Sequence, residues 1–138
     1  MTASSQPACA STTDGGGTVL SESSHEHLAR GARLFDEGAY LEAHEVWEEH
    51  WRRETDETCR SLFQGLIQVA AAFHKLVATG SAESALRLLT KGLTKLDACP
   101  TSVMGPEIAV FCLGARACSE ALKAGSFVAL PKIQMPDR

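Results

Sequence analysis

Residues 62–78 read LFQGLIQVAAAFHKLVA and form the most apolar segment of this 138-residue chain. Spacings of three and four residues, the period of an α-helix, place large apolar residues on one face: Leu62, Leu66, Ala70, Phe73 and Val77. The opposite face carries small, amide and basic side chains: Gln64, Gln68, Ala71 and Lys75. Because Gln68 interrupts the apolar run, the run is too short to span a bilayer. We expect this helix to lie in the core of a soluble domain and to present amide groups to a neighbouring helix.

The chain from Ser23 onward predicts helices joined by short connections. Capping residues, prolines and helix-ending glycines divide it into residues 23–38, 40–54, 55–80, 81–99 and 106–125. The first of these helices begins with a capping box from Ser23 to Glu26. No segment has the alternation of a β-strand. The predicted fold class is all-α, a compact bundle of about five antiparallel helices with short connections and helical-hairpin packing.

Composition divides the chain into three regions. Residues 1–22 are rich in Ser, Thr and Gly and predict a flexible tail. They lack the apolar stretch of a secretory signal and the arginines of a transit peptide, so we expect a cytoplasmic protein. Residues 23–125 form the helical-bundle domain. Residues 126–138 contain two prolines and no helical period, and they predict an extended C-terminal arm.

Charge and cysteine content exclude several classes of protein. The net charge is −4 and the pI is about 5.7, which argues against a nucleic-acid or anionic-membrane binder because either would need a basic face. The five cysteines include no C-x-x-C pair, so neither a zinc ribbon nor a thioredoxin-type motif is expected. The simplest interpretation is free, mostly buried thiols in a reducing cytosol.

The run EAHEVWEEHW, residues 42–51, concentrates the polar residues that could carry chemistry. Helical spacing of four, three and four places one set on a single stripe: Tyr40, His44, Trp47 and Trp51. We expect this stripe to be the buried face of its helix, with His44 as a polar side chain within it and Glu48 at its edge.

Two interpretations of His44 remain open. As a metal ligand, it would act with Glu48 four residues later and with Glu45, in a His-Glu-x-x-Glu pattern that lacks the second histidine of the zinc hydrolases. As a structural residue, it would be held by Glu48 or a glutamine amide, because a buried polar group must be hydrogen-bonded.

The motifs between Gly31 and Leu96 resemble the domain of unknown function 309 family, which comprises small all-α proteins. The quoted runs are GARLFDEGAYLEAHEVWEEHWR, FQGLIQVAAAFHKL and TGSAESALRLLTKGLTKL. The residues that carry the resemblance are Phe35, Gly38, Tyr40, Glu42, Ala43, His44, Glu45, Glu48, Trp51, Gln64, Gly65, Leu66, Ile67, Gln68, His74, Gly80, Ala85, Leu88 and Leu89. The resemblance implies the fold and a polar cluster, and the family's name assigns it no activity.

The sequence therefore predicts a polar cluster between the second and third helices. Its candidate ligand-binding residues are His44, Glu45, Glu48, Gln64, Gln68 and His74. The leading hypothesis is a non-catalytic binding or interaction module with a protein or small-molecule partner and no cofactor. The alternative is a metal-dependent hydrolase that holds a divalent metal ion with His44 and Glu48. No catalytic residue is assigned, and whether the chain forms a homo-oligomer stays open.

Overall fold

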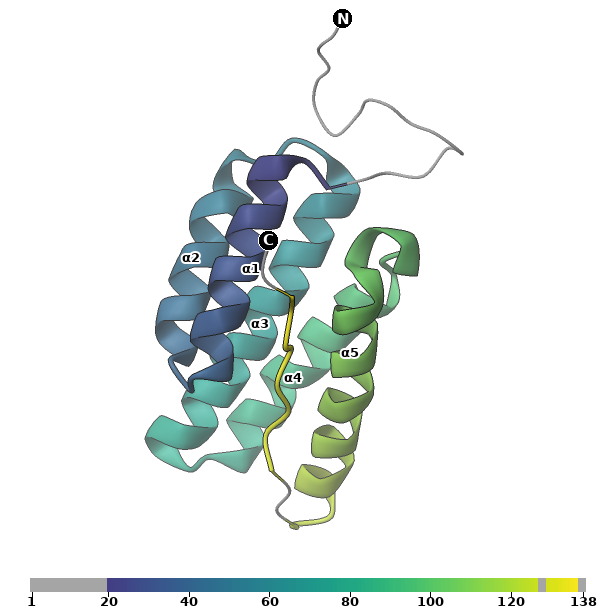
Figure 1. Cartoon of the computed structure of the whole chain (residues 1–138). Helices are drawn as coiled ribbons and strands as arrows, with labels where there is room; N and C mark the ends of the chain where they lie inside the picture. The colour runs from purple at the N-terminus through teal and green to yellow at the C-terminus, as the bar shows by residue number, and fades with distance from the viewer. Residues whose placement is uncertain (1–19, 127–128, 137–138) are drawn as a thin grey trace, which may run out of the picture.

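The computed structural model describes residues 20–126 and 129–136. Five helices follow one another along the chain (Figure 1): α1 (Glu22–Asp36), α2 (Tyr40–Arg53), α3 (Glu57–Thr79), α4 (Ala82–Asp97) and α5 (Thr101–Lys123). Links of two or three residues make consecutive helices antiparallel, and each packs mainly against its neighbours in sequence. The described part of the chain contains no strand. The all-α prediction is confirmed.

The apolar segment at residues 62–78 lies within α3, which packs against both α2 and α4. The Asp56 side chain begins this helix by accepting the Cys59 N–H at 2.9 Å, and Gly80 ends it in the left-handed conformation at φ 70°. Among the described helices, α3 alone is long and apolar enough to cross a membrane. Ten residues of α3 are buried and form the centre of the core. Burial inside the bundle is therefore enough to explain why this helix is apolar.

An aromatic cluster centred on Phe35 joins four helices. The Phe35 ring centroid lies 4.9 Å from that of Tyr40, 6.0 Å from Trp47, 5.6 Å from Phe73 and 5.3 Å from Phe111. Tilted and edge-to-face pairs of this kind add about 0.5–1.5 kcal/mol each beyond the area that they bury. The cluster therefore holds α1, α2, α3 and α5 around one core.

Glycines allow two pairs of helices to approach closely. A Cβ atom on Gly31 of α1 would lie 2.1 Å from Trp47 Nε1 of α2, so the indole ring fits only where the side chain is a hydrogen. The same indole N–H donates to the Leu28 carbonyl at 3.3 Å. Between α3 and α4, a Cβ atom on Gly92 would lie 2.8 Å from the Gly65 carbonyl oxygen. These contacts fix how α2 is rotated toward α1 and how near α4 comes to α3.

The predicted start of the first helix is wrong by two residues. The helix is capped by Ser21, whose Oγ accepts the Ser24 N–H at 3.0 Å, and not by a capping box from Ser23 to Glu26. The earlier start has a physical reason: it buries Ser24 in the first turn, where its hydroxyl reaches His50 of α2.

The predicted break before the last helix is present, but the helical turn ahead of it was not predicted. Residues 101–104 form that turn, Gly105 then leaves the helical region at φ 84° and ψ 163°, and Pro106 begins the long part of α5.

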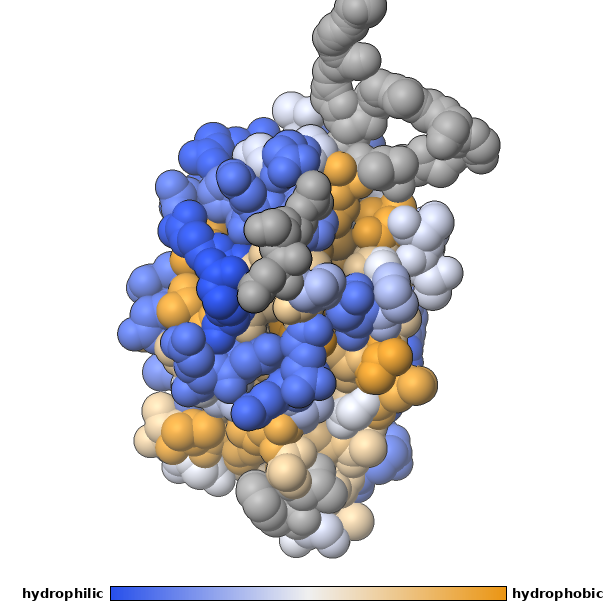
Figure 2. Space-filling model, viewed as in Figure 1, coloured by the Kyte–Doolittle hydropathy of each residue, from blue (hydrophilic) through white to orange (hydrophobic). Residues whose placement is uncertain are grey.

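Figure 2 shows hydrophilic side chains over α1 and hydrophobic patches on the side of α5.

The C-terminal arm lies along the bundle without regular secondary structure (Figure 1). The Asp36 carboxylate of α1 accepts the backbone N–H groups of Ile133 at 2.7 Å and Gln134 at 2.8 Å. The Ile133 side chain is only 3% exposed and packs on the core. These contacts join the arm to the end of α1. The predicted flexible tail falls almost wholly on residues 1–19, outside the described residues.

Candidate functional site

The predicted polar cluster lies along a groove between α2 and α3. One part, the polar hollow, has a volume of about 170 Å³ and is lined by Glu48 and Trp51 of α2 and by Gln64, Ile67 and Gln68 of α3. The other part, the apolar hollow, has a volume of about 220 Å³. Its walls include Leu41, His44, Ala71, His74, Lys75, Ala78, Thr79 and Leu88. The two hollows together are the α2–α3 groove.

The structure brings five of the six candidate residues to this groove and divides them between its two parts. The polar hollow contains Glu48, Gln64 and Gln68, whereas His44 and His74 line the apolar hollow. Glu45 is exposed and lines neither hollow, because its position on α2 turns it toward solvent.

The prediction that His44 is a buried member of an aromatic stripe is wrong. Its side chain is 27% exposed, and its Nε2 atom lies 3.8 Å from Glu48 Oε1, which is too long for a hydrogen bond. The cause is the rotation of α2, which turns Ala43, Trp47 and His50 toward the interior. Of the four residues on the predicted stripe, only Trp47 is fully buried.

Two buried polar atoms of the polar hollow's walls lack partners. Among the residues that the structure describes, neither Trp51 Nε1 nor Gln68 Oε1 has a hydrogen-bond partner. The Trp51 ring is held in place, because the Arg60 guanidinium lies 4.5 Å from its centroid and donates to the Trp51 carbonyl at 2.8 Å. A buried donor or acceptor left unpaired costs about 1–3 kcal/mol, so two in one hollow need an explanation.

Charged side chains of both signs lie near the groove. Glu48 of the polar hollow, 33% exposed, forms an ion pair with Arg52 at 3.4 Å. Its neighbour Glu49 forms an ion pair with Arg53 at 3.7 Å. At the other end of the groove, α3 contributes the exposed Lys75.

His44 and Glu48 are the two predicted metal ligands. In residues 20–126 and 129–136, no group of three or more His, Cys, Asp or Glu side chains lies close enough to hold a metal ion. Catalytic zinc sites use three protein ligands, and Glu45, the third residue of the hydrolase hypothesis, points away from the groove. A site here would need further donors, such as the amide oxygens of Gln64 and Gln68.

A buried polar cluster that the sequence reasoning missed ties α1, α2 and α3 together. His50 is 6% exposed, and its Nε2 atom lies 2.9 Å from Ser24 Oγ and 2.8 Å from Glu54 Oε1. The Ser24 hydroxyl donates to the same Glu54 oxygen at 2.8 Å, and Glu54 Oε2 accepts the Asp56 N–H at 3.0 Å. The Phe63 ring of α3 covers His50 with a centroid distance of 4.7 Å.

This cluster has the residue types of a hydrolase triad without its geometry. In a triad, the serine and the acid contact opposite nitrogens of the histidine. Here Ser24 and Glu54 both contact Nε2 of His50, and Nδ1 is buried with no partner among the described residues. The arrangement ties helices together. The signal for it was present in the sequence, since Ala43, Trp47, His50 and Glu54 also have spacings of four, three and four.

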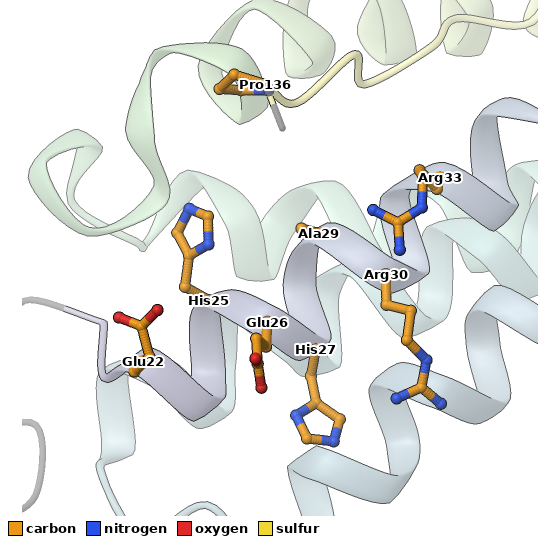
Figure 3. Close-up of a pocket in the computed structure, with 8 residues that line it drawn as sticks. All are labelled: Glu22, His25, Glu26, His27, Ala29, Arg30, Arg33 and Pro136. Atoms are coloured by element: carbon orange, nitrogen blue, oxygen red, sulfur yellow. The ribbon is translucent and has the colours of Figure 1, made fainter. Parts of the chain in front are cut away.

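A larger hollow of about 610 Å³ lies on the surface of α1 beside Pro136 of the C-terminal arm (Figure 3). Its charges are mixed, with Arg30 and Arg33 beside Glu22 and Glu26. In Figure 3 the His25 side chain points toward the arm, whereas Glu26 and Arg30 point to the other side of the helix. Because these side chains do not converge, we assign this hollow no site.

The four cysteines of the described residues are buried, as predicted for most of them; Cys9 lies outside that part of the chain. Burial is the main reason that the pKa of Cys99 is raised to about 11, with a smaller contribution from nearby Cys112. Burial also raises the pKa values of Cys112 and Cys118. These three thiols are therefore protonated at neutral pH and are poor nucleophiles.

Residues 28–88 match the sequence family described as a domain of unknown function (DUF309). This segment, residues 28–88 of the 138-residue chain, is similar to the DUF309 family. The resemblance inferred from its motifs is thus confirmed, and the DUF309 segment contains all of α2 and α3 and so both walls of the groove. No curated protein matches the chain. The DUF309 description gives no activity.

Proposed function

We propose that this protein is a non-catalytic binding module and that the α2–α3 groove is its binding site. The observation that carries the proposal is the lining of the polar hollow, which combines the ring of Trp51 with the amides of Gln64 and Gln68. Trp51 Nε1 and Gln68 Oε1 have no hydrogen-bond partner among the described residues.

The need to pack α2 against α3 does not explain why α3 carries glutamines at positions 64 and 68. Two helices that needed only to pack could carry Leu in place of Gln68 and Gln64, and would avoid the cost of removing amides from water. Trp51 and Ile67 already supply apolar surface to the same hollow. Amides combined with a fixed aromatic ring are typical of a small site with a few placed polar groups.

The geometry gives less support to the hydrolase alternative. Of its three residues, His44 and Glu48 lie near one another, whereas Glu45 lines neither hollow. Elemental analysis of protein purified without chelator tests this alternative directly. About one divalent metal ion per chain, lost on changing His44→Ala, would favour a metal site over the binding module.

A nuclear magnetic resonance screen tests the proposed site. Isotope-labelled protein is titrated with small neutral, cationic and anionic fragments, and the moving backbone signals are mapped. We expect the fragments that bind to shift signals from residues 41–51 and 64–78 and to lose binding in Gln68→Met. The matched control is Gln134→Met, a change of the same type on the C-terminal arm, which should bind as the wild type does. Binding that maps elsewhere, or that survives Gln68→Met unchanged, would contradict the proposal.

A further inference from the structure

We propose that the C-terminal arm is a tethered ligand that leaves its site between α1 and α5 while the bundle stays folded. The vacated site, here called the arm site, then binds an extended segment of another protein. Asp36 of α1, Gly114 of α5 and the core surface under Ile133 form the arm site. This inference goes beyond the proposed function, because the arm site shares no residue with the α2–α3 groove.

The arm lies between two helices whose backbones do not meet. Among the described helices, α1 and α5 do not pack directly on one another, and the arm runs between them (Figure 1). The Ile133 side chain is buried in the core, and Leu130 and Met135 are partly buried against it. The arm site therefore already holds an extended chain by its apolar side chains.

The main chain of the arm is held by one carboxylate. Asp36 accepts the N–H groups of two consecutive residues, Ile133 at 2.7 Å and Gln134 at 2.8 Å. Gln134 has a φ of 58°, a left-handed conformation that is strained for a residue other than glycine. Contacts to main-chain N–H groups do not depend on the side chains of the residues that donate them. A segment of different sequence can therefore make the same two bonds.

The fit of the arm specifies the chemistry of the partner. A Cβ atom on Gly114 would lie 3.0 Å from Pro131 Cβ, so the glycine makes room for a proline ring. Two residues later, Ile133 supplies the buried aliphatic side chain. We expect a partner segment with an aliphatic residue at that position, a proline two residues before it, and glycine or asparagine directly after it, where φ is positive.

The arm is attached more weakly than the helices. Among the described residues, the two bonds to Asp36 are the only hydrogen bonds that join the main chain of the arm to a helix. Lys132, Gln134 and Pro136 are exposed. The aromatic cluster centred on Phe35 joins the helices without any residue of the arm. A segment with few buried contacts opens locally at a lower free energy than the whole fold.

Hydrogen exchange in the full-length wild-type chain tests whether the arm opens by itself. We expect the Ile133 and Gln134 amides to exchange at least about 100-fold faster than core amides of α3, after correction for intrinsic rates. Low concentrations of urea should accelerate exchange in α3 and leave exchange in the arm unchanged. Arm amides that exchange at the rate of the α3 core would show that the arm leaves only on global unfolding, and would overturn the proposal.

A peptide with the sequence of residues 129–136, ALPKIQMP, tests binding to the arm site. It is titrated into full-length Gln134→Val, because a β-branched residue at φ 58° displaces the arm and leaves the buried Ile133 unaltered. The matched control is Lys132→Val, a change at an exposed neighbouring position. We expect about tenfold tighter binding to Gln134→Val than to Lys132→Val, since the arm of the control still occupies the site. A peptide with serine in place of isoleucine should bind about tenfold more weakly.

Backbone signals show where the peptide binds. We expect shifts in residues 28–36 and 108–118, which lie on α1 and α5. Equal peptide affinity in the two variants, no binding to either, or shifts confined to the α2–α3 groove would overturn the proposal. Wild-type dimers that the peptide dissociates would identify the arm of a second copy as the occupant, and would overturn the assignment to another protein. Each of these results leaves the fragment test of the groove unaffected.

Discussion

The two histidines of α2 should differ sharply in what they contribute to stability. His50→Leu removes the ring that contacts Ser24 and Glu54 and leaves a nearly buried carboxylate with fewer donors. Hydrogen bonds to charged groups contribute about 1.5–3 kcal/mol, and the burial of a leucine beside Phe63 offsets about 1 kcal/mol of that loss. We therefore expect a net loss of about 0.5–2 kcal/mol for His50→Leu.

His44→Leu is the matched substitution on the same helix. The partly exposed ring of His44 has only a 3.8 Å contact with Glu48, and an exposed pair of this kind contributes about 0–1 kcal/mol. We expect the stability of His44→Leu to lie within about 0.5 kcal/mol of the wild type. A structural tether was one of the two interpretations of His44 that the sequence left open, so the two variants distinguish that interpretation from the structure.

Urea unfolding at neutral pH, followed by tryptophan fluorescence, gives both free energies under one condition. The double variant Ser24→Ala with His50→Leu should lose less than the sum of the single losses, because both changes remove the same hydrogen bond. A loss for His44→Leu that equals or exceeds the loss for His50→Leu would refute the assignment of the buried tether.

Three further predictions follow from single contacts. Gly31→Ala places a methyl group 2.1 Å from an atom of the buried Trp47 ring. We expect the protein to lose about 1–3 kcal/mol of stability, because this clash outweighs the higher helix propensity of alanine. Thermal unfolding measures the loss, which should be smaller in a Trp47→Phe background. Burial raises the pKa of Cys99 in the folded protein to about 11 from 9.0. The stability that the protonated thiol contributes is therefore complete below pH 9 and is lost as the pH rises through 11. The unfolding midpoint should fall over that pH range, and it should fall less steeply in Cys99→Ala. Asp36→Ala frees two backbone donors of the C-terminal arm, so hydrogen exchange at Ile133 should accelerate while the core of α3 stays protected.

The helices could be predicted because their signals are local. The spacing of apolar residues in α3, the turn residue Gly80 and the break at Gly105 depend only on nearby chain. The same reasoning placed Gln64 and Gln68 on the face of α3 that meets α2. The order of the helices and much of one wall of the groove could therefore be predicted from the sequence.

The rotation of α2 about its own axis could not be predicted from the sequence. Two stripes of equal spacing share Trp47, one through His44 and the other through His50, and periodicity favours neither. The choice depends on contacts distant in sequence, because Gly31 admits the indole ring and Ser24 provides a partner for His50. The exposure of Glu45 has the same origin, since it follows from the rotation that buries Trp47 and His50.

The central claim is that the polar hollow is kept for a ligand and not for packing, and the stability of Gln68→Met tests it most directly. Methionine has a similar shape without the buried acceptor, and removal of an unsatisfied group is neutral or stabilising. We predict an unchanged free energy of unfolding or a gain of about 1 kcal/mol, together with loss of fragment binding in the groove. A loss of several kcal/mol would mean that the Gln68 amide holds the helices together, and it would contradict the account.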